Sequence, residues 1–165
     1  MLFRSPVPNT DDTEAVLAAK SLMVPVEGVT PERVPDTYNA PRAAGTHRAL
    51  DILAPRGTPV LAAAGGRVFK LRTNPSGGTT VYVLDRDERF LYYYAHLEGY
   101  REGLAEGMSL EAGDVIGYVG TTGNAPTNVP HLHFQLTRYR RDRYWDGEPI
   151  NPHAFLARRG KKREQ

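Results

Sequence analysis

Residues 66–97 read GRVFKLRTNPSGGTTVYVLDRDERFLYYYAHL, and this stretch decides the fold class. β-Branched and aromatic residues dominate the segments 66–72, 79–84 and 90–97, as is typical of strands. The sequences 74–78 and 85–88 separate these segments, and each favours a hairpin turn; the glycines of the first can adopt positive φ. The stretch therefore predicts consecutive hairpins of an all-β fold.

The same pattern covers most of the chain. Six further β-prone segments are separated by glycine and proline: 22–26, 49–53, 60–62, 114–119, 131–137 and 149–150. Residues 10–22 differ, because alanine, valine and leucine recur there at helical spacing and Thr10, Asp11 or Asp12 can cap the segment. We expect a short N-terminal helix there, and a loop over the polar and irregular residues 99–113.

Length and composition fit one domain with a hydrophobic core. The chain has 165 residues, 40% of them hydrophobic, and no apolar run long enough for a membrane span. A net charge of +2 gives no argument for nucleic acid as a partner. Without cysteine, a bound metal must be held by nitrogen and oxygen. Residues 1–6 lack the features of a secretory signal, which predicts a cytosolic, processed or trimmed chain, and we prefer the processed or trimmed interpretation.

Basic residues gather in two places. Arginines occupy positions 138, 140, 141 and 143, and residues 158–163 read RRGKKR. Charge runs of this kind are usually a solvated loop and a solvated terminus, which is the interpretation we prefer. Attraction to an anionic polymer or a membrane surface is the alternative.

The pair His47 and Asp51 has the residue types of a zinc site. The sequence that follows, with prolines at positions 55 and 59, opposes a helix, and four residues of a straight strand would span roughly 13 Å. Ligands of one zinc ion lie only about 2.0–2.2 Å from the metal. The chain must therefore bend between the two residues, with His47 on a loop and Asp51 just inside a strand.

Three more histidines fall in predicted strands or at their ends. His131 and His133 alternate along the segment 131–137 and should point to one side, with leucine and phenylalanine on the other. By the same alternation His96 should share a face with Tyr92 and Tyr94. Two imidazoles and one carboxylate leave a tetrahedral zinc open to water, as in catalytic sites, and two histidines remain for proton transfer.

Five motifs follow one another along the chain: HRALD at 47–51, APRGTPV at 54–60, YAHL at 94–97, GDVIGYVGTTGN at 113–124 and HLHF at 131–134. In this order they resemble the lysostaphin-type zinc endopeptidases of cell-wall peptidoglycan, peptidase family M23. The sequences DTYNAPR at 36–42 and PINP at 149–152 are similar to members from Gram-negative envelopes. The resemblance implies an antiparallel β-sheet core with an open groove, and a location in the periplasm or cell envelope.

The resemblance also implies roles for individual residues. Carried over by position, one zinc ion is bound by His47, Asp51 and His133, while His96 and His131 act on protons. Tyr38 and Tyr94 are weaker candidates for contact with the oxyanion or substrate; the preferred interpretation of each is a packed aromatic residue. His153 is interpreted as an ordinary surface or core residue.

Two positions depart from the family pattern. Ala49 stands where members usually have glycine, and Arg48 where an acidic or polar residue is common. A methyl group at position 49 could restrict the bend that unites His47 with Asp51, but no ligand or catalytic residue is missing. We therefore interpret the departure as a minor change that does not abolish activity, and we expect a φ at position 49 that alanine can adopt.

The function implied is hydrolysis of peptide cross-links in peptidoglycan, at the D-alanyl to meso-diaminopimelate bond of a Gram-negative wall or at a glycine bridge. One alternative is a non-catalytic peptidoglycan-binding or amidase-activating module on the same fold. A biotinyl or lipoyl carrier is the other, although Lys70 lies within a predicted strand rather than at a hairpin tip. The expected organisation is a leader or linker over 1–21, a peptidase domain over 22–157 and a basic tail over 158–165.

Overall fold

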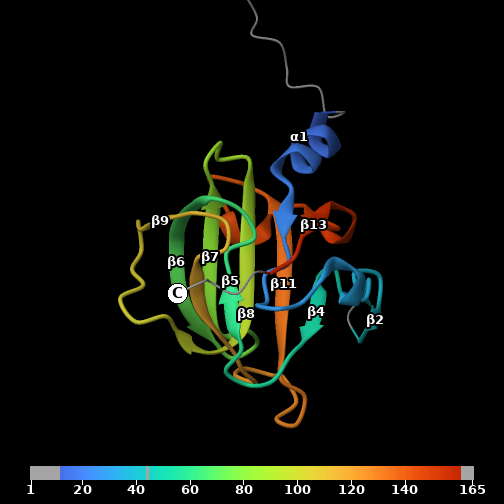
Figure 1. Cartoon of the computed structure of the whole chain (residues 1–165), viewed down its shortest axis with the longest axis vertical. Coiled ribbons are helices and arrows are strands. Elements are labelled where there is room, and N and C mark those ends of the chain that lie inside the picture. The colour runs from blue at the N-terminus through green and yellow to red at the C-terminus, as the bar shows by residue number, and fades with distance from the viewer. Residues whose placement is uncertain (1–11, 44, 161–165) are drawn as a thin grey trace, which may run out of the picture.

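The computed structural model describes residues 12–43 and 45–160 (Figure 1). Helix α1 (Thr13–Lys20) precedes a chain of short and long strands with three 3₁₀ helices, η2 (Pro31–Arg33), η3 (Tyr144–Asp146) and η4 (His153–Phe155). The strands are β1 (Leu22–Met23), β2 (Pro41–Arg42), β3 (Gly45–Thr46), β4 (Leu50–Leu53), β5 (Pro59–Leu61), β6 (Gly66–Asn74), β7 (Gly78–Asp85), β8 (Phe90–Tyr100), β9 (Ser109–Leu110), β10 (Val115–Val119), β11 (His131–Arg138), β12 (Pro149–Ile150) and β13 (Leu156–Arg158). Among the described residues, none of the helices has the length and apolar character that crossing a membrane requires.

An antiparallel sheet forms the centre of the molecule (Figure 1). Its strands follow the order β12-β11-β8-β7-β6-β9; β4 pairs with β11, and β10 pairs with both β8 and β5. Strands β6, β7 and β8 are consecutive hairpins, and Gly78 has a φ of +68° where the first turn enters β7. The expected all-β fold with a short N-terminal helix is confirmed.

The element boundaries differ from expectation in several places. Helix α1 spans 13–20, and its expected caps Thr10 and Asp11 lie outside the described residues. The expected loop 99–113 contains the end of β8 and the two residues of β9, which pair with β6. Strands β2 and β3 form a hairpin, and β13 pairs in parallel with β1; the sequence pattern did not indicate these short strands.

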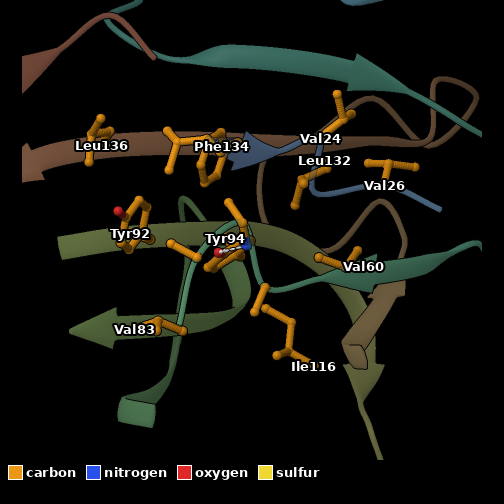
Figure 2. Packing of buried hydrophobic residues seen from close by; sticks show 14 of the residues in the cluster. Val24, Val26, Val60, Val83, Tyr92, Tyr94, Ile116, Leu132, Phe134 and Leu136 are labelled. Carbon is orange, nitrogen blue, oxygen red and sulfur yellow. Dashed lines mark hydrogen bonds between the residues drawn. The ribbon is translucent and has the colours of Figure 1, made fainter. Parts of the chain in front are cut away.

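The hydrophobic core covers one face of this sheet (Figure 2). Leu132, Phe134 and Leu136 of β11 point into it, as their alternation with polar residues predicted. Chain segments around Val24, Val60 and Ile116 pack against them; the labelled side chains of Figure 2 are drawn from this cluster. The opposite face of β11, β8, β7 and β6 is not covered by this core, and it carries the site described below.

A β-bulge changes the facing of residues along β8. Tyr94 pairs with Val81 and Leu97 with Thr79, so β8 has one more residue than β7 between these two pairs. His96 lies in this interval with a φ of +63°, in the left-handed region. Its side chain therefore leaves the core face that holds Tyr92 and Tyr94, and the expectation that the three share a face is wrong for His96.

Candidate metal centre

A bend between β3 and β4 brings His47 next to Asp51. Arg48, between the two strands, has a φ of +56°, and its backbone N–H donates to the carbonyl of Tyr38 over 2.7 Å. Ala49 is fully buried and does not adopt a positive φ. The expected bend is therefore present, with His47 outside a strand and Asp51 within β4, but the unusual backbone is at position 48 and not at 49.

Thr37 positions both of these residues. Its carbonyl accepts a hydrogen bond from His47 Nδ1 over 3.0 Å, and its hydroxyl accepts one from the Asp51 backbone N–H over 2.9 Å. Because a carbonyl can only accept, Nδ1 of His47 carries the proton and Nε2 is left with a free lone pair. Our sequence reasoning missed Thr37, although it lies within the DTYNAPR segment.

Three ligand atoms from distant parts of the chain meet on the open face. His133 lies directly opposite Asp51 in the β11–β4 ladder. His47 Nε2 and Asp51 Oδ1 are 3.1 Å apart, His133 Nδ1 and Asp51 Oδ1 3.4 Å, and His47 Nε2 and His133 Nδ1 3.3 Å. Tetrahedral ligands at about 2.0–2.1 Å from zinc lie about 3.3–3.4 Å from one another. The triangle has the dimensions of three ligands around one zinc ion.

The Asp51 carboxylate has an oxygen that lacks an ordinary partner. Its Oδ1 is buried and accepts no hydrogen bond, although three imidazole nitrogens lie within 3.7 Å. Burial raises the pKa of Asp51, but the His133 side chain and the other nearby imidazoles outweigh burial and lower it. An ionised, buried oxygen without a hydrogen bond fits a metal ion at the centre of the triangle.

Two more imidazoles stand beside this triangle. His96 Nδ1 donates to the carbonyl of Thr122 over 2.7 Å, and His131 Nδ1 donates to that of Val129 over 2.9 Å. In the neutral form of either ring, Nε2 is therefore the unprotonated nitrogen. The two ring centroids are 5.0 Å apart, and His131 Nε2 is 3.7 Å from Asp51 Oδ1. This arrangement can accept and return a proton next to the metal position.

Burial keeps two of the imidazoles neutral. Burial lowers the pKa of His47 and His96 below the ordinary value, and the hydrogen bonds to Thr37 and Thr122 offset this only in part. A neutral His47 can bind a metal ion, and a neutral His96 can accept a proton at pH 7.

A cleft of about 640 Å³ opens above the cluster. It is lined by the three candidate ligands, His96 and His131, and also by Arg42, Leu53, Tyr93, Asn124, Val129 and Gln135. Arg42, from the β2–β3 hairpin, donates to Asp51 Oδ2 over 3.2 Å, so the second carboxylate oxygen is held by a guanidinium while the first faces the imidazoles. Sequence reasoning missed Arg42 and Tyr93; the alternation of Tyr93 with the buried Tyr92 and Tyr94 was the available signal.

The two tyrosines proposed for substrate contact have other surroundings. Tyr94 is fully buried, and its hydroxyl accepts a hydrogen bond from the Ala63 backbone N–H over 2.9 Å (Figure 2), so its assignment to the site is wrong. Tyr38 is partly buried against the core, and it does not line the cleft. His153 lies apart from the cluster and donates from Nε2 to the carbonyl of Val34.

The site and its sheet match a known family of hydrolases. The sequence model of peptidase family M23 matches residues 45–152. The chain belongs to this family. M23 peptidases are zinc-dependent, so the resemblance noted from the sequence is confirmed, and the His–Asp–His triangle is a candidate for the metal site of an M23 domain.

Two curated relatives of this M23 chain are named as endopeptidases, and the name of one includes peptidoglycan. The L-Ala–D-Glu endopeptidase of Bacillus subtilis is 33% identical over 112 residues, which are 65% of this chain and 34% of that protein. The peptidoglycan DD-endopeptidase ShyC of Vibrio cholerae is 36% identical over 90 residues, which are 54% of this chain and 20% of that protein. The M23 chain thus spans about a third or less of these curated relatives.

The fold is that of a solved M23 structure. The antimicrobial peptidase lysostaphin from Staphylococcus simulans superposes with a TM-score of 0.66 at 25% sequence identity, over 83% of this chain and 53% of that one. Because the similarity extends to the antiparallel sheet, it confirms the expected fold class.

Proposed function

We propose that this chain is a zinc-dependent endopeptidase that hydrolyses peptide cross-links of bacterial peptidoglycan in the periplasm or cell envelope. The observation that carries the proposal is the triangle of His47, Asp51 and His133, at tetrahedral ligand spacing, with two further imidazoles facing the same cleft. A metal-dependent hydrolase needs both the three ligands and the two further imidazoles, because the ligands hold the metal and the imidazoles transfer protons.

Zinc, when bound by these three residues, would polarise the substrate carbonyl and lower the pKa of a water molecule towards neutrality. In their neutral forms, His96 and His131 present Nε2 to the same space, where either can accept a proton. The resulting imidazolium can return that proton to the leaving amine or stabilise an oxyanion. Thr122 and Val129 keep each Nδ1 proton in place throughout, which fixes the direction of transfer.

Peptidoglycan is the proposed substrate because one relative is named a peptidoglycan endopeptidase and another is named for the L-Ala–D-Glu bond that it cuts. The cleft is open, which suits a peptide that is part of a large polymer. The domain proposed to carry this activity covers residues 22–157, between a leader or linker over 1–21 and a basic tail over 158–165. All five metal and proton-transfer candidates are present, which favours the enzyme over a non-catalytic wall-binding or amidase-activating module.

A digestion experiment tests the proposal. Purified peptidoglycans with direct and with glycine-bridged cross-links are incubated with the protein, with and without a chelator, and new termini are identified by mass spectrometry. We expect chelator-sensitive cleavage of one peptide bond type. Absence of new termini from every wall, with zinc bound and the protein folded, would refute the enzymatic proposal and leave the binding module.

The two proton-transfer candidates need a separate test. His96→Ala and His131→Ala should each retain zinc and the fold while turnover falls by about 10²–10⁴-fold. The control is His153→Ala, since His153 contacts Val34 and lies apart from the cluster. Turnover near the wild-type rate in both site variants would remove these residues from the mechanism.

A further inference from the structure

A row of aromatic rings leads away from the candidate metal centre along the open face of the sheet. The ring of Tyr93 on β8 is 6.1 Å from the ring of His133, centroid to centroid, and Tyr82 on β7 is 4.7 Å from Tyr93. Tyr144 of η3 is 5.2 Å from Tyr82, and Trp145 is 5.1 Å from Tyr144. The rings of His133, Tyr93 and Tyr82 come from the neighbouring strands β11, β8 and β7, so this part of the row belongs to the sheet itself.

The strand register gives the direction of this aromatic row. Gln135 of β11 lies opposite Tyr93, and Tyr93 lies opposite Tyr82, so the row crosses the strands from β11 to β7. At about 4.8 Å between strands, Tyr82 lies about 10 Å from β11, which about three residues of extended peptide can span. The loop between β11 and β12 ends the row, because Tyr144 packs edge-on against Tyr82 and against Phe69 of β6.

Exposed apolar side chains occur at both ends of this surface. Among residues 12–43 and 45–160, three large hydrophobic side chains are exposed: Leu53 at 64%, Val129 at 38% and Trp145 at 62%. Leu53 and Val129 line the cleft, and Trp145 ends the row. The exposed indole of Trp145, packed edge-on against Tyr144, gives a bound ligand an apolar surface to cover at the end of the row.

The rim of the row is polar without a strong net charge. Three of the four arginines that our sequence analysis singled out pair with carboxylates of the same loop or its edge: Arg140 with Asp142, Arg143 with Asp146, and Arg138 with Glu148; Arg141 is exposed and is not in one of these pairs. These pairs reduce the attraction to an anionic polymer or an acidic peptide that an arginine cluster alone would give. They leave hydrogen-bonding groups around an aromatic surface, which suits an uncharged ligand with polar edges.

We propose that Tyr82, Tyr144 and Trp145 form a second subsite, which binds a sugar ring of the glycan strand while the attached peptide lies in the cleft. The inference rests on the proposed function, since peptidoglycan joins its peptides to sugars. A sugar ring has an apolar C–H face for the aromatic rings and hydroxyl or acetamido groups at its edge for the rim. The subsite makes the enzyme prefer peptides that are still attached to glycan.

Trp145 is itself the probe for the first test, because it is the only tryptophan of the chain. Wild-type protein is titrated with glycan strands from which an amidase has removed the peptides, and separately with free stem peptides, while tryptophan emission is recorded. We expect a saturable change in emission with stripped glycan and a much smaller one with free peptides. An unchanged emission with glycan, or a response only to peptides, would overturn the proposal.

Kinetics supply the second test. Trp145→Ala should lower kcat/KM on polymeric peptidoglycan about three- to tenfold, with a clearly smaller effect on a free stem peptide, and Trp145→Phe should restore most of the loss. The matched control is Tyr118→Ala, because Tyr118 lies on β10 opposite Pro59 and Gly99. Equal losses on polymer and peptide would overturn the subsite.

The two proposals fail in different ways. If no wall is cleaved but stripped glycan still changes the emission of Trp145, the subsite stands and the enzymatic function fails. If walls are cleaved and Trp145→Ala behaves as wild type on both substrates, the function stands and the subsite is wrong.

Discussion

Replacing Ala49 by glycine, the residue usual in the family, should destabilise this protein. The Ala49 side chain is fully buried and its backbone does not lie in the left-handed region, so glycine relieves no strain there. Removing the buried methyl group costs about 0.8 kcal/mol, and the freer unfolded chain costs about 0.4–1 kcal/mol more. The sum is about 1–2 kcal/mol, which for a domain of this size lowers Tm by about 3–6 °C.

The matched variant is Arg48→Gly, one position earlier. Arg48 occupies the left-handed region, which costs a non-glycine residue about 1–2 kcal/mol, and glycine removes that cost while adding about 0.4–1 kcal/mol through the unfolded chain. This variant should therefore be neutral or slightly more stable. Thermal unfolding and zinc titration of both variants and the wild type measure the two effects. A higher Tm or tighter zinc binding in Ala49→Gly would refute the reasoning, because the strain would then lie at position 49.

Three further outcomes are expected. Elemental analysis should find about one zinc per chain, lost in His133→Ala and kept in His131→Ala; the reverse pattern would exchange their roles. The metal-free protein should lose stability as pH falls below about 6.5, because burial lowers the folded-state pKa of His47 and His96 and the unfolded chain then binds more protons. Urea unfolding at several pH values measures this change, and a rise in the free energy of unfolding on acidification would contradict it. Arg42→Ala should weaken zinc binding about 10–100-fold by releasing Asp51 Oδ2, as competition with a chelator would show; unchanged affinity would mean that the carboxylate needs no such support.

The sequence was sufficient for the elements with strong periodic patterns. The hairpins around 74–78 and 85–88 and the buried side of 131–137 follow from side-chain alternation and turn chemistry, and the structure confirms them. Strands β2, β3, β9 and β13 have two or three residues each, which is too short for any alternation to be visible. Their pairing depends on the position of the rest of the chain, so local sequence does not predict it.

At the site, the sequence identified the candidate ligands and proton-transfer residues, but it did not predict the directions of all their side chains. The bend before Asp51 followed from the reach of a zinc ion, but its location at Arg48 did not, because arginine has no special tendency to adopt a positive φ. A second error concerned His96, whose expected alternation with Tyr94 holds only for a strand without a bulge. Thr37 and Arg42 act through contacts made after folding, and spacing along the chain does not show such contacts.

The distribution of left-handed residues adds an argument about function. Among the described residues, four that are not glycine adopt a positive φ: Ser21, Arg48, Glu88 and His96. Ser21 ends helix α1 and Glu88 lies in the turn between β7 and β8, where such a backbone is ordinary. Arg48 and His96 instead set the direction of an imidazole at the cleft, at a cost of about 1–2 kcal/mol each. A module that only bound the wall would gain nothing from these two costs, whereas an enzyme needs both imidazoles in position, so the backbone itself favours catalysis over a binding scaffold.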